Sequence, residues 1–509
     1  MLTAILVLLL IAVVSYSVYF RWTRRKFFAA ISSMKGPTSL PFIGSGYRFV
    51  GQTSPEQMHK VMTSLTGQCK SPTPIWSGQN LILVVHSPEH AQVVLKSEDC
   101  LDRAYFNRYF QLDHGMLTTS VSSWKSVRKL LNMSLSPSMI NSYIPIVNQK
   151  SRIMVEQVAK LVGKSEQNVY HDIAKWALDM ICATVLGLDI NVQTEGTGVP
   201  YLKVVNEYLT LVTKRMSMGM TTGDSIPNFF YNLTQDGKNF TKAAQTFRSV
   251  SNIIMERKAP FDQSDMDDFA ANPRKPRILL DMIYHLAAAD PEHMSNESIA
   301  EHLDEIIFAG QDAMADVISK IILMLAMHPD IQERVHQEIV SVFPDESSVL
   351  SQEDCSKLTY TEMFCKETLR LFPASPFIGR RVDADVKLDD RHTLPKGAEV
   401  IVAFFKMHRD PAIWGPDADW FDPDNFMPEK VAQRHPYAFL PFSAGSRNCL
   451  GFKFAWYPVK IVLAHLIRSY RFRTSLKMDD LVLQNWSIII LKIAQGCPVQ
   501  LEKRTSCVS

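Results

Sequence analysis

Hydrophobic residues gather in a few long runs, and the first of them opens the chain. Residues 2–20 contain no charged side chain and are dense in Leu, Ile and Val. As an α-helix this run would span roughly 28 Å, close to the hydrocarbon thickness of a bilayer. Four basic residues follow at once: Arg21, Arg24, Arg25 and Lys26. The pattern predicts a transmembrane anchor over residues 1–20, and the positive-inside rule places the chain after it in the cytosol.

A cleaved signal peptide is the competing interpretation of this run. It would prefer a basic start and small residues at a cleavage site, whereas Tyr16, Tyr19 and Phe20 occupy that place. The anchor is therefore favoured. Residues 21–44 are basic and then rich in proline and glycine, which predicts a stiff linker or hinge because proline fixes φ and cannot continue a helix. The remaining residues, 45–509, are expected to form one large domain.

Helical periodicity dominates this domain. Residues 148–184 and 204–257 are mainly helical in pattern, residues 296–327 form a long apolar helix, and residues 328–343 an amphipathic one. Short strands are expected at residues 81–86 and in a hairpin over residues 482–501. The predicted fold class is mainly α with small β-sheets.

Composition and charge exclude some functions. Apolar residues make up 46% of the chain and charged residues 21%, which suits a large globular core. A net charge of +2 gives no electrostatic reason to expect nucleic acid as a partner. The 8 cysteines include no Cys-x-x-Cys pair, so neither a zinc ribbon nor a disulfide framework is indicated. This usage suits a reducing compartment.

The strongest chemical signal is the loop at residues 442–451. Gly445 permits a tight turn, and Gly451 leaves room beside Cys449 for a flat group. A helix starting near Leu450 would turn its free N–H groups toward the sulfur and favour the thiolate. A single thiolate is a poor zinc site, which needs about four ligands, but a good axial ligand for haem iron.

The residues Phe442, Gly445, Arg447, Cys449 and Gly451 form the pattern Phe-x-x-Gly-x-Arg-x-Cys-x-Gly. This pattern resembles the haem-thiolate signature of the cytochrome P450 superfamily. The resemblance runs from Pro37 to about Arg504. The segments Trp-Lys-Ser-Val-Arg-Lys and Glu-Thr-Leu-Arg-Leu-Phe-Pro are most similar to the microsomal clan that contains fatty-acid hydroxylases and its divergent insect branches. The resemblance implies the cytochrome P450 fold and a haem b bound through Cys449.

Further cofactor contacts are implied by the same resemblance. Trp124 and Arg128 are four residues apart and share a helix face, where the family holds a haem propionate. Arg380 lies where the family places another propionate-binding arginine, and Arg447 is a further candidate. Small side chains at Ala309 and Gly310 would let the flat cofactor approach the long helix.

The centre of that helix, Ala309-Gly310-Gln311-Asp312-Ala313, resembles the oxygen-activation motif Ala-Gly-x-Asp-Thr. In the family the acid relays protons and the threonine hydroxyl assists oxygen activation, so Asp312, Gly310 and Ala313 are the expected catalytic positions. Here the threonine is replaced by Ala313, which has no hydroxyl. Efficient oxygen activation is therefore in question.

A structural brace is also expected. Glu367 and Arg370 are three apart on one helix and match the family's second signature, Glu-x-x-Arg. The family's third partner is an arginine, and Asn425 stands in its place, so we expect a neutral hydrogen bond instead of a second charge.

The resemblance implies a membrane-anchored monooxygenase of the endoplasmic reticulum that acts on an apolar small molecule. Electrons would come from NADPH through a flavoprotein reductase, with cytochrome b5 as a further partner. Positive charge on the reductase-facing side would come from Arg447, Lys453 and Lys129. Two alternatives stay open: a haem-thiolate isomerase or dehydratase of a peroxide substrate, motivated by Ala313, and a non-catalytic haem or lipid carrier.

Overall fold

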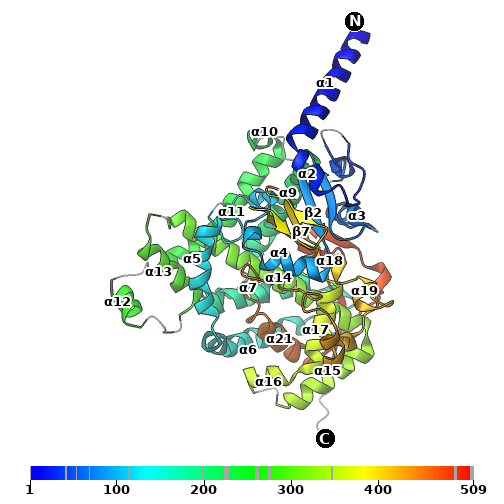
Figure 1. Cartoon of the computed structure of the whole chain (residues 1–509). Coiled ribbons are helices and arrows are strands. Elements are labelled where there is room, and N and C mark those ends of the chain that lie inside the picture. The colour runs from blue at the N-terminus through cyan, green and yellow to red at the C-terminus, as the bar shows by residue number, and fades with distance from the viewer. Residues whose placement is uncertain are drawn as a thin grey trace.

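The computed structural model describes residues 2–504 except 41–42, 53, 68, 113, 197–198, 223–227, 258–262, 273–274, 276, 293, 346–347 and 487–489. Its long N-terminal helix projects away from a body made mostly of helices (Figure 1). The small sheet containing β2 and β7 lies near this helix, and α15, α16, α17 and α21 lie at the opposite end (Figure 1). The predicted fold class, mainly α with small sheets, is confirmed.

The longer helices are α1 (Leu2–Thr23), α3 (Pro55–Thr66), α4 (Pro88–Lys96), α5 (Val121–Leu131), α6 (Pro137–Ala159), α7 (Tyr170–Val185), α9 (Val199–Thr222), α11 (Gln235–Arg257), α12 (Gln263–Ala271), α13 (Leu279–Ala289), α14 (Asn296–Met327), α15 (Pro329–Val342), α17 (Thr359–Leu371) and α21 (Trp456–Ser469). The shorter ones are α2 (Arg25–Ala30), α8 (Val192–Glu195), α10 (Asn228–Leu233), α16 (Gln352–Lys357), α18 (Phe404–Met407), α19 (Pro411–Trp414) and α20 (Pro428–Gln433). Side-chain caps fix several starts: Ser295 accepts a hydrogen bond from the N–H of Ser298 at the start of α14.

The strands form small separate sheets. The largest has the order β1 (Thr73–Ser77), β2 (Asn80–Val85), β7 (Glu399–Val402) and β4 (Ile378–Arg381); β2 and β7 are parallel and the other pairs antiparallel. A second sheet has the order β3 (Gln167–Asn168), β11 (Pro498–Lys503) and β8 (Tyr470–Arg473). Two antiparallel pairs complete the set: β5 (Val386–Lys387) with β6 (Thr393–Leu394), and β9 (Leu483–Trp486) with β10 (Ile490–Ile493).

The end of α1 is attached to the body by aromatic side chains. Phe20 packs edge-on against Trp76 of β1, with 5.2 Å between the ring centroids, and Phe28 of α2 stacks on the same indole at 5.1 Å. The Gln79 side-chain amide donates a hydrogen bond of 2.8 Å to the Tyr16 hydroxyl. The segment after the anchor is therefore folded onto the β1–β2 hairpin at its start, where the sequence pattern predicted a linker or hinge.

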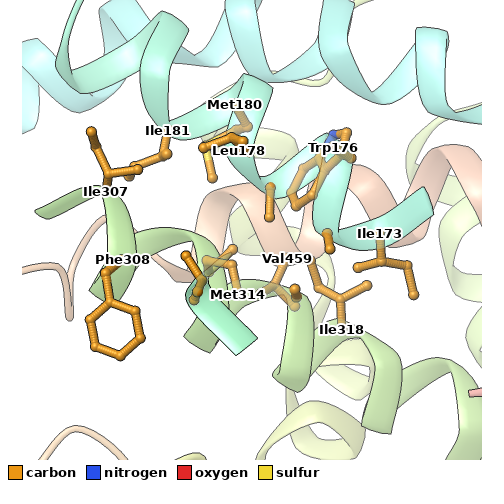
Figure 2. Close-up of a cluster of buried hydrophobic side chains, with 14 of the residues drawn as sticks. Ile173, Trp176, Leu178, Met180, Ile181, Ile307, Phe308, Met314, Ile318 and Val459 are labelled. Carbon is orange, nitrogen blue, oxygen red and sulfur yellow. The ribbon is translucent and has the colours of Figure 1, made fainter. Parts of the chain in front are cut away.

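Helix α14 runs through the core with the bounds predicted from its apolar run. Its apolar side chains meet those of α7 and α21, as Figure 2 shows for Ile307 and Met314 beside Ile181 and Val459. Trp176 of α7 is fully buried in this contact region. The position of α14 is therefore set by packing along much of its length.

One helix boundary differs from the sequence prediction. Helix α21 begins at Trp456, whereas a start near Leu450 was expected. Residues 450–455 form turns instead. Proline is favoured in the first turn of a helix because it has no N–H to donate, and an interior position such as Pro145 of α6 is less favourable. Pro458 therefore favours a regular helix that begins close before it, and the N–H of Tyr457 bonds to the carbonyl of Phe454, one residue short of the α-helical partner.

Candidate active site

The cysteine loop is shaped by two residues with positive φ. Ser443 has φ of 59° and Gly445 of 75°. A Cβ on Gly445 would lie 1.9 Å from the carbonyl oxygen of Leu95, at the end of α4, so both the backbone angle and the close approach require glycine. The N–H of Cys449 donates to the carbonyl of Phe442 at 2.9 Å and closes the loop. This geometry holds Cys449 at the loop's end.

Cys449 is exposed, whereas Cys100, Cys182, Cys355, Cys365 and Cys497 are buried. A Cβ added to Gly451 would meet nothing within 4 Å, so the space beside this glycine is open. Burial by the surrounding walls raises the pKa of the Cys449 thiol, and the N–H of Gly451 and the charge of Arg128 only partly oppose it. Because α21 begins seven residues after the cysteine, the N–H that favours the thiolate is that of Gly451 in the turn before the helix.

The middle of α14 has an uncovered face. Ala309 and Ala313 are exposed, and Ile306, Gly310 and Val317 are half-buried, although most of the helix is buried. These positions recur every three or four residues and so share one side of the helix. Small side chains on that side leave room for a flat molecule.

Gly310 has a different role from the one expected. A Cβ at this position would lie 2.6 Å from Cδ1 of Ile181 in α7. The missing side chain therefore lets α7 and α14 approach each other. Ala309 and Ala313, and not Gly310, provide most of the open surface.

A loop between Gly115 and Thr119 connects this helix to the cysteine loop. The Glu305 carboxylate, one turn before Ala309, accepts a hydrogen bond from the N–H of Leu117 at 3.0 Å. The Arg447 guanidinium donates to the carbonyl of Thr119 at 3.3 Å. Through this loop, the uncovered part of α14 and Cys449 border the same region.

Four arginines meet beside that region: Arg103, Arg128, Arg380 and Arg447. Arg380 and Arg447 are buried, and the Arg447 guanidinium lies over the Trp124 ring at 4.5 Å. Burial and the charge of Arg103 lower the pKa of Arg447 to about 9. Burial, Arg103 and Arg447 lower the pKa of Arg380 well below its ordinary value. The guanidinium groups thus repel one another.

Two acids act on this arginine cluster. Against the effect of burial, the charges of Asp102 and Glu305 act to raise the pKa of Arg103 and Arg447, but burial raises the pKa of the Glu305 carboxyl to about 8, so it is mostly protonated at neutral pH. Among the described residues, Nε of Arg103 and both Nε and Nη1 of Arg447 are buried without a hydrogen-bond partner. Buried donors without partners are costly. A ligand carrying two carboxylates, as haem does, would satisfy them.

Arg128 already has protein partners. Its guanidinium donates to the carbonyl of Asn448 at 2.8 Å and to the Asn448 side-chain oxygen at 2.6 Å. Nε of Arg128 is buried without a partner among the described residues. Arg128 therefore links α5 to the cysteine loop and retains one donor for a ligand. Trp124, one turn earlier, is buried.

Asp312 points away from the uncovered face of α14. Its Oδ1 lies 2.7 Å from Nζ of Lys492 in β10, and the Tyr170 hydroxyl of α7 lies 3.4 Å from the same atom. Both members of the ion pair are buried. Burial alone would lower the pKa of Lys492, but the charges of Asp312 and Tyr170 raise it. The predicted proton relay would have to begin from an acid that is held by a lysine.

The structure brings the predicted brace together. Arg370 and Glu367 form two parallel hydrogen bonds of 2.7 Å, and both side chains are fully buried. The Asn425 amide donates to Glu367 at 3.1 Å. Arg370 also donates to the carbonyl of His408, whose ring Nε2 accepts the N–H of Leu440 just before the cysteine loop. The brace therefore reaches the loop through His408.

The sequence patterns missed three residues of the site. Arg103 lies in an irregular segment without periodicity, Glu305 resembles any acid on a helix, and Lys492 is 180 residues from Asp312. No local signal marks these residues. One expected surface charge is also wrong: Arg447 is buried, whereas Lys129 and Lys453 are exposed.

Comparisons with known proteins agree with this geometry. The family model Cytochrome P450 matches residues 34–496. Cytochrome P450 4c21 of Blattella germanica is 31% identical over 458 residues, 88% of this chain and 89% of the relative. Cytochrome P450 4V2 of Homo sapiens is 29% identical over 440 residues, 85% of this chain and 82% of the relative. Cytochrome P450 4c3 of Drosophila melanogaster is 29% identical over 517 residues, 98% of this chain and 95% of the relative.

The matched region contains the cysteine loop, the uncovered part of α14, the arginine cluster and the Glu367–Arg370 brace. The arginine donors, the exposed Cys449 and the open space beside Gly451 fit haem. The chain belongs to the cytochrome P450 family and is a haem-thiolate monooxygenase.

Proposed function

We propose that this enzyme inserts one oxygen atom from O2 into an apolar small molecule, with electrons that NADPH supplies through a flavoprotein reductase. Haem, when bound, supplies the oxygen chemistry through an iron with a sulfur ligand. The observation that carries the proposal is the exposed Cys449 thiol beside the open face of α14. Cys449 would hold the iron, and Arg103, Arg380 and Arg447 would bind the carboxylates.

An apolar substrate is favoured by the open face itself. Ile306, Ala309, Gly310, Ala313 and Val317 offer no charge and no side-chain hydrogen-bond donor. Asp312, which precedes Ala313, is turned toward Lys492. A substrate at this face would be held by apolar contact and by exclusion of water. The substrate classes that fit are lipids, hormone-like molecules and apolar xenobiotics.

We also propose a place for the protein in the endoplasmic reticulum membrane, with the catalytic domain in the cytosol. Residues Thr3–Thr23 form a helix long and apolar enough to span a bilayer, and none of its window is buried by the rest of the protein. Exposed Lys129 and Lys453 provide positive charge near the cysteine loop for an acidic reductase surface or for cytochrome b5. Salt would weaken such docking.

A second candidate function rests on Ala313. This exposed position faces the site without a hydroxyl, so the protein offers no proton donor there. A peroxide substrate brings its own activated oxygen and needs no such donor. An isomerase or dehydratase of a peroxide is therefore the alternative to a monooxygenase.

Two measurements test these proposals on the full-length chain in membranes. The reduced, carbon monoxide-bound spectrum should show the Soret band of a thiolate-ligated haem, and a Cys449→His variant should show that of an imidazole-ligated haem. Oxygen uptake with NADPH, reductase and a panel of apolar substrates should then be accompanied by a hydroxylated product. Rapid turnover of a peroxide, without an NADPH-dependent product, would support the isomerase or dehydratase. Ligand binding without turnover of either kind would support a non-catalytic carrier.

A further inference from the structure

A cluster of two histidines and an aspartate lies outside the active site, in a well-packed corner of the domain. His90 belongs to α4, and Asp389 and His392 to the turn between β5 and β6. Oδ2 of Asp389 lies 2.9 Å from Nε2 of His90 and 2.8 Å from Nδ1 of His392. The three atoms all lie within 4.8 Å of one another. Two imidazoles from distant parts of the chain thus converge on one carboxylate oxygen.

Two other polar atoms of the cluster, Oδ1 of Asp389 and Nδ1 of His90, already have partners. Oδ1 of Asp389 accepts the N–H groups of Arg391 at 2.7 Å and of His392 at 2.8 Å. Nδ1 of His90 lies 2.9 Å from the Ser71 hydroxyl. These contacts orient the Asp389 carboxylate and fix the His90 ring. As a result, Oδ2 of Asp389 and Nε2 of His90 face each other. Metal ligands are typically held by such outer contacts.

The degree of exposure also suits an ion. The side chain of His90 is 10% exposed, that of His392 20% and that of Asp389 38%. The site is therefore open on one side, where water could complete the coordination. Imidazole and carboxylate ligands together suit zinc, and no described cysteine is part of the cluster.

We propose that His90, Asp389 and His392 form a binding site for a zinc ion, with water as the fourth ligand. Tetrahedral coordination at Zn–N and Zn–O distances of about 2.0–2.2 Å separates the ligand atoms by about 3.4 Å. The distances from Oδ2 of Asp389 to Nδ1 of His392 (2.8 Å) and to Nε2 of His90 (2.9 Å) would thus increase by about half an ångström when zinc binds. In this form the His90 ring carries its proton on Nδ1, and this N–H donates a hydrogen bond to the Ser71 hydroxyl.

The site has a consequence for the enzyme. It joins α4 to the β5–β6 turn, and α4 ends at the residues whose backbone contacts Gly445 of the cysteine loop. A zinc ion would fix the start of this helix. The ion is a structural clamp behind the loop, and it takes no part in the oxygen chemistry.

The test uses the purified full-length, haem-loaded chain, titrated with zinc chloride in a calorimeter after treatment with a chelator. We expect one equivalent to bind. Asp389→Asn and His392→Gln should each weaken binding by about tenfold or more. X-ray absorption at the zinc edge should show nitrogen and oxygen neighbours at about 2.0–2.1 Å and no sulfur at about 2.3 Å.

Two matched variants provide controls. Asp390 neighbours Asp389, but its side chain is 97% exposed and pairs with Lys387 at 2.8 Å. His171 is exposed on α7. Asp390→Asn and His171→Gln should bind zinc like the parent, and every variant should keep the carbon monoxide spectrum of the parent. Absence of stoichiometric binding, sulfur in the zinc shell, or equal affinity in Asp389→Asn would overturn the proposal.

Discussion

Nζ of Lys492 lies 2.7 Å from Oδ1 of Asp312, and this contact attaches the hairpin β9–β10 to the middle of α14. The Tyr170 hydroxyl lies 3.2 Å from the same lysine nitrogen, so α7 joins the contact. One turn further along α14, Lys320 pairs with Asp316 and donates to the carbonyl of Leu491. The hairpin and α14 are therefore held together by two buried lysines.

Removing Lys492 should destabilise the protein more than removing the pair. Lys492→Met leaves Asp312 buried without its cation, which costs about 3–5 kcal/mol, whereas the double variant Asp312→Asn/Lys492→Met should recover a large part of this loss. Unfolding in guanidinium chloride, followed by circular dichroism, gives the free energies. The exposed pair Lys387–Asp390 is the control, because its loss should cost less than about 1 kcal/mol. Equal loss in the single and double variants would contradict the inferred coupling.

Ala313→Thr should improve oxygen use if the missing hydroxyl limits the reaction. A hydrogen bond worth about 1 kcal/mol corresponds to about a fivefold rise in product formed per NADPH, with a matching fall in released hydrogen peroxide. Both quantities are measured in the reconstituted system with reductase. Ala313→Val has nearly the shape of threonine without its hydroxyl, so it should show no gain. A gain in both variants would assign the effect to side-chain volume.

Arg103→Gln should speed the loss of haem. The variant removes a half-buried cation whose Nε has no protein partner among the described residues. Loss of a charge-assisted hydrogen bond costs about 1.5–3 kcal/mol, which corresponds to about 10- to 150-fold faster transfer of haem to an excess of apomyoglobin. Arg391→Gln, at an exposed position, is the control and should match the parent. Unchanged transfer in Arg103→Gln would exclude Arg103 from haem binding.

Glu305 should make stability depend on pH. Burial raises the pKa of its carboxyl from 4.5 to about 8, so the folded state binds a proton that the unfolded chain has lost between these values. This contribution to stability is complete below pH 4.5 and is lost as the pH rises through about 8. Glu305→Gln keeps the hydrogen bond from Leu117 without titrating. We therefore compare the melting temperatures of the parent and of Glu305→Gln. The difference, parent minus variant, should fall from pH 5 to pH 8, and a rise would contradict a raised pKa of Glu305.

Local patterns were enough to predict several parts of this enzyme. The apolar run of α14 predicted its observed bounds, and the residues from Phe442 to Gly451 indicated the cofactor before any geometry was known. These features depend on neighbours in sequence, since helix periodicity, caps and turn glycines act over a few residues.

Other parts depend on contacts that sequence spacing does not encode. The role of Gly310 is set by Ile181, and that of Asp312 by Lys492, in both cases across more than a hundred residues. Arg103 is drawn into the arginine cluster by its bridge to Arg380, which no periodicity predicts. Pro458 is a local signal that favours the later start of α21, because a proline deeper in the helix would leave a carbonyl without its donor.

The aromatic attachment of α1 changes what the N-terminal helix can do in a bilayer. A flexible tether would let the catalytic domain rotate freely above the membrane. With Phe20 and Phe28 both packed on Trp76, the helix and the β1–β2 hairpin turn together. In the proposed membrane setting, a change in the tilt of the helix would reorient the catalytic domain. Bilayer thickness, which influences the tilt of a transmembrane helix, would then also influence the angle at which the enzyme meets the membrane surface and its reductase.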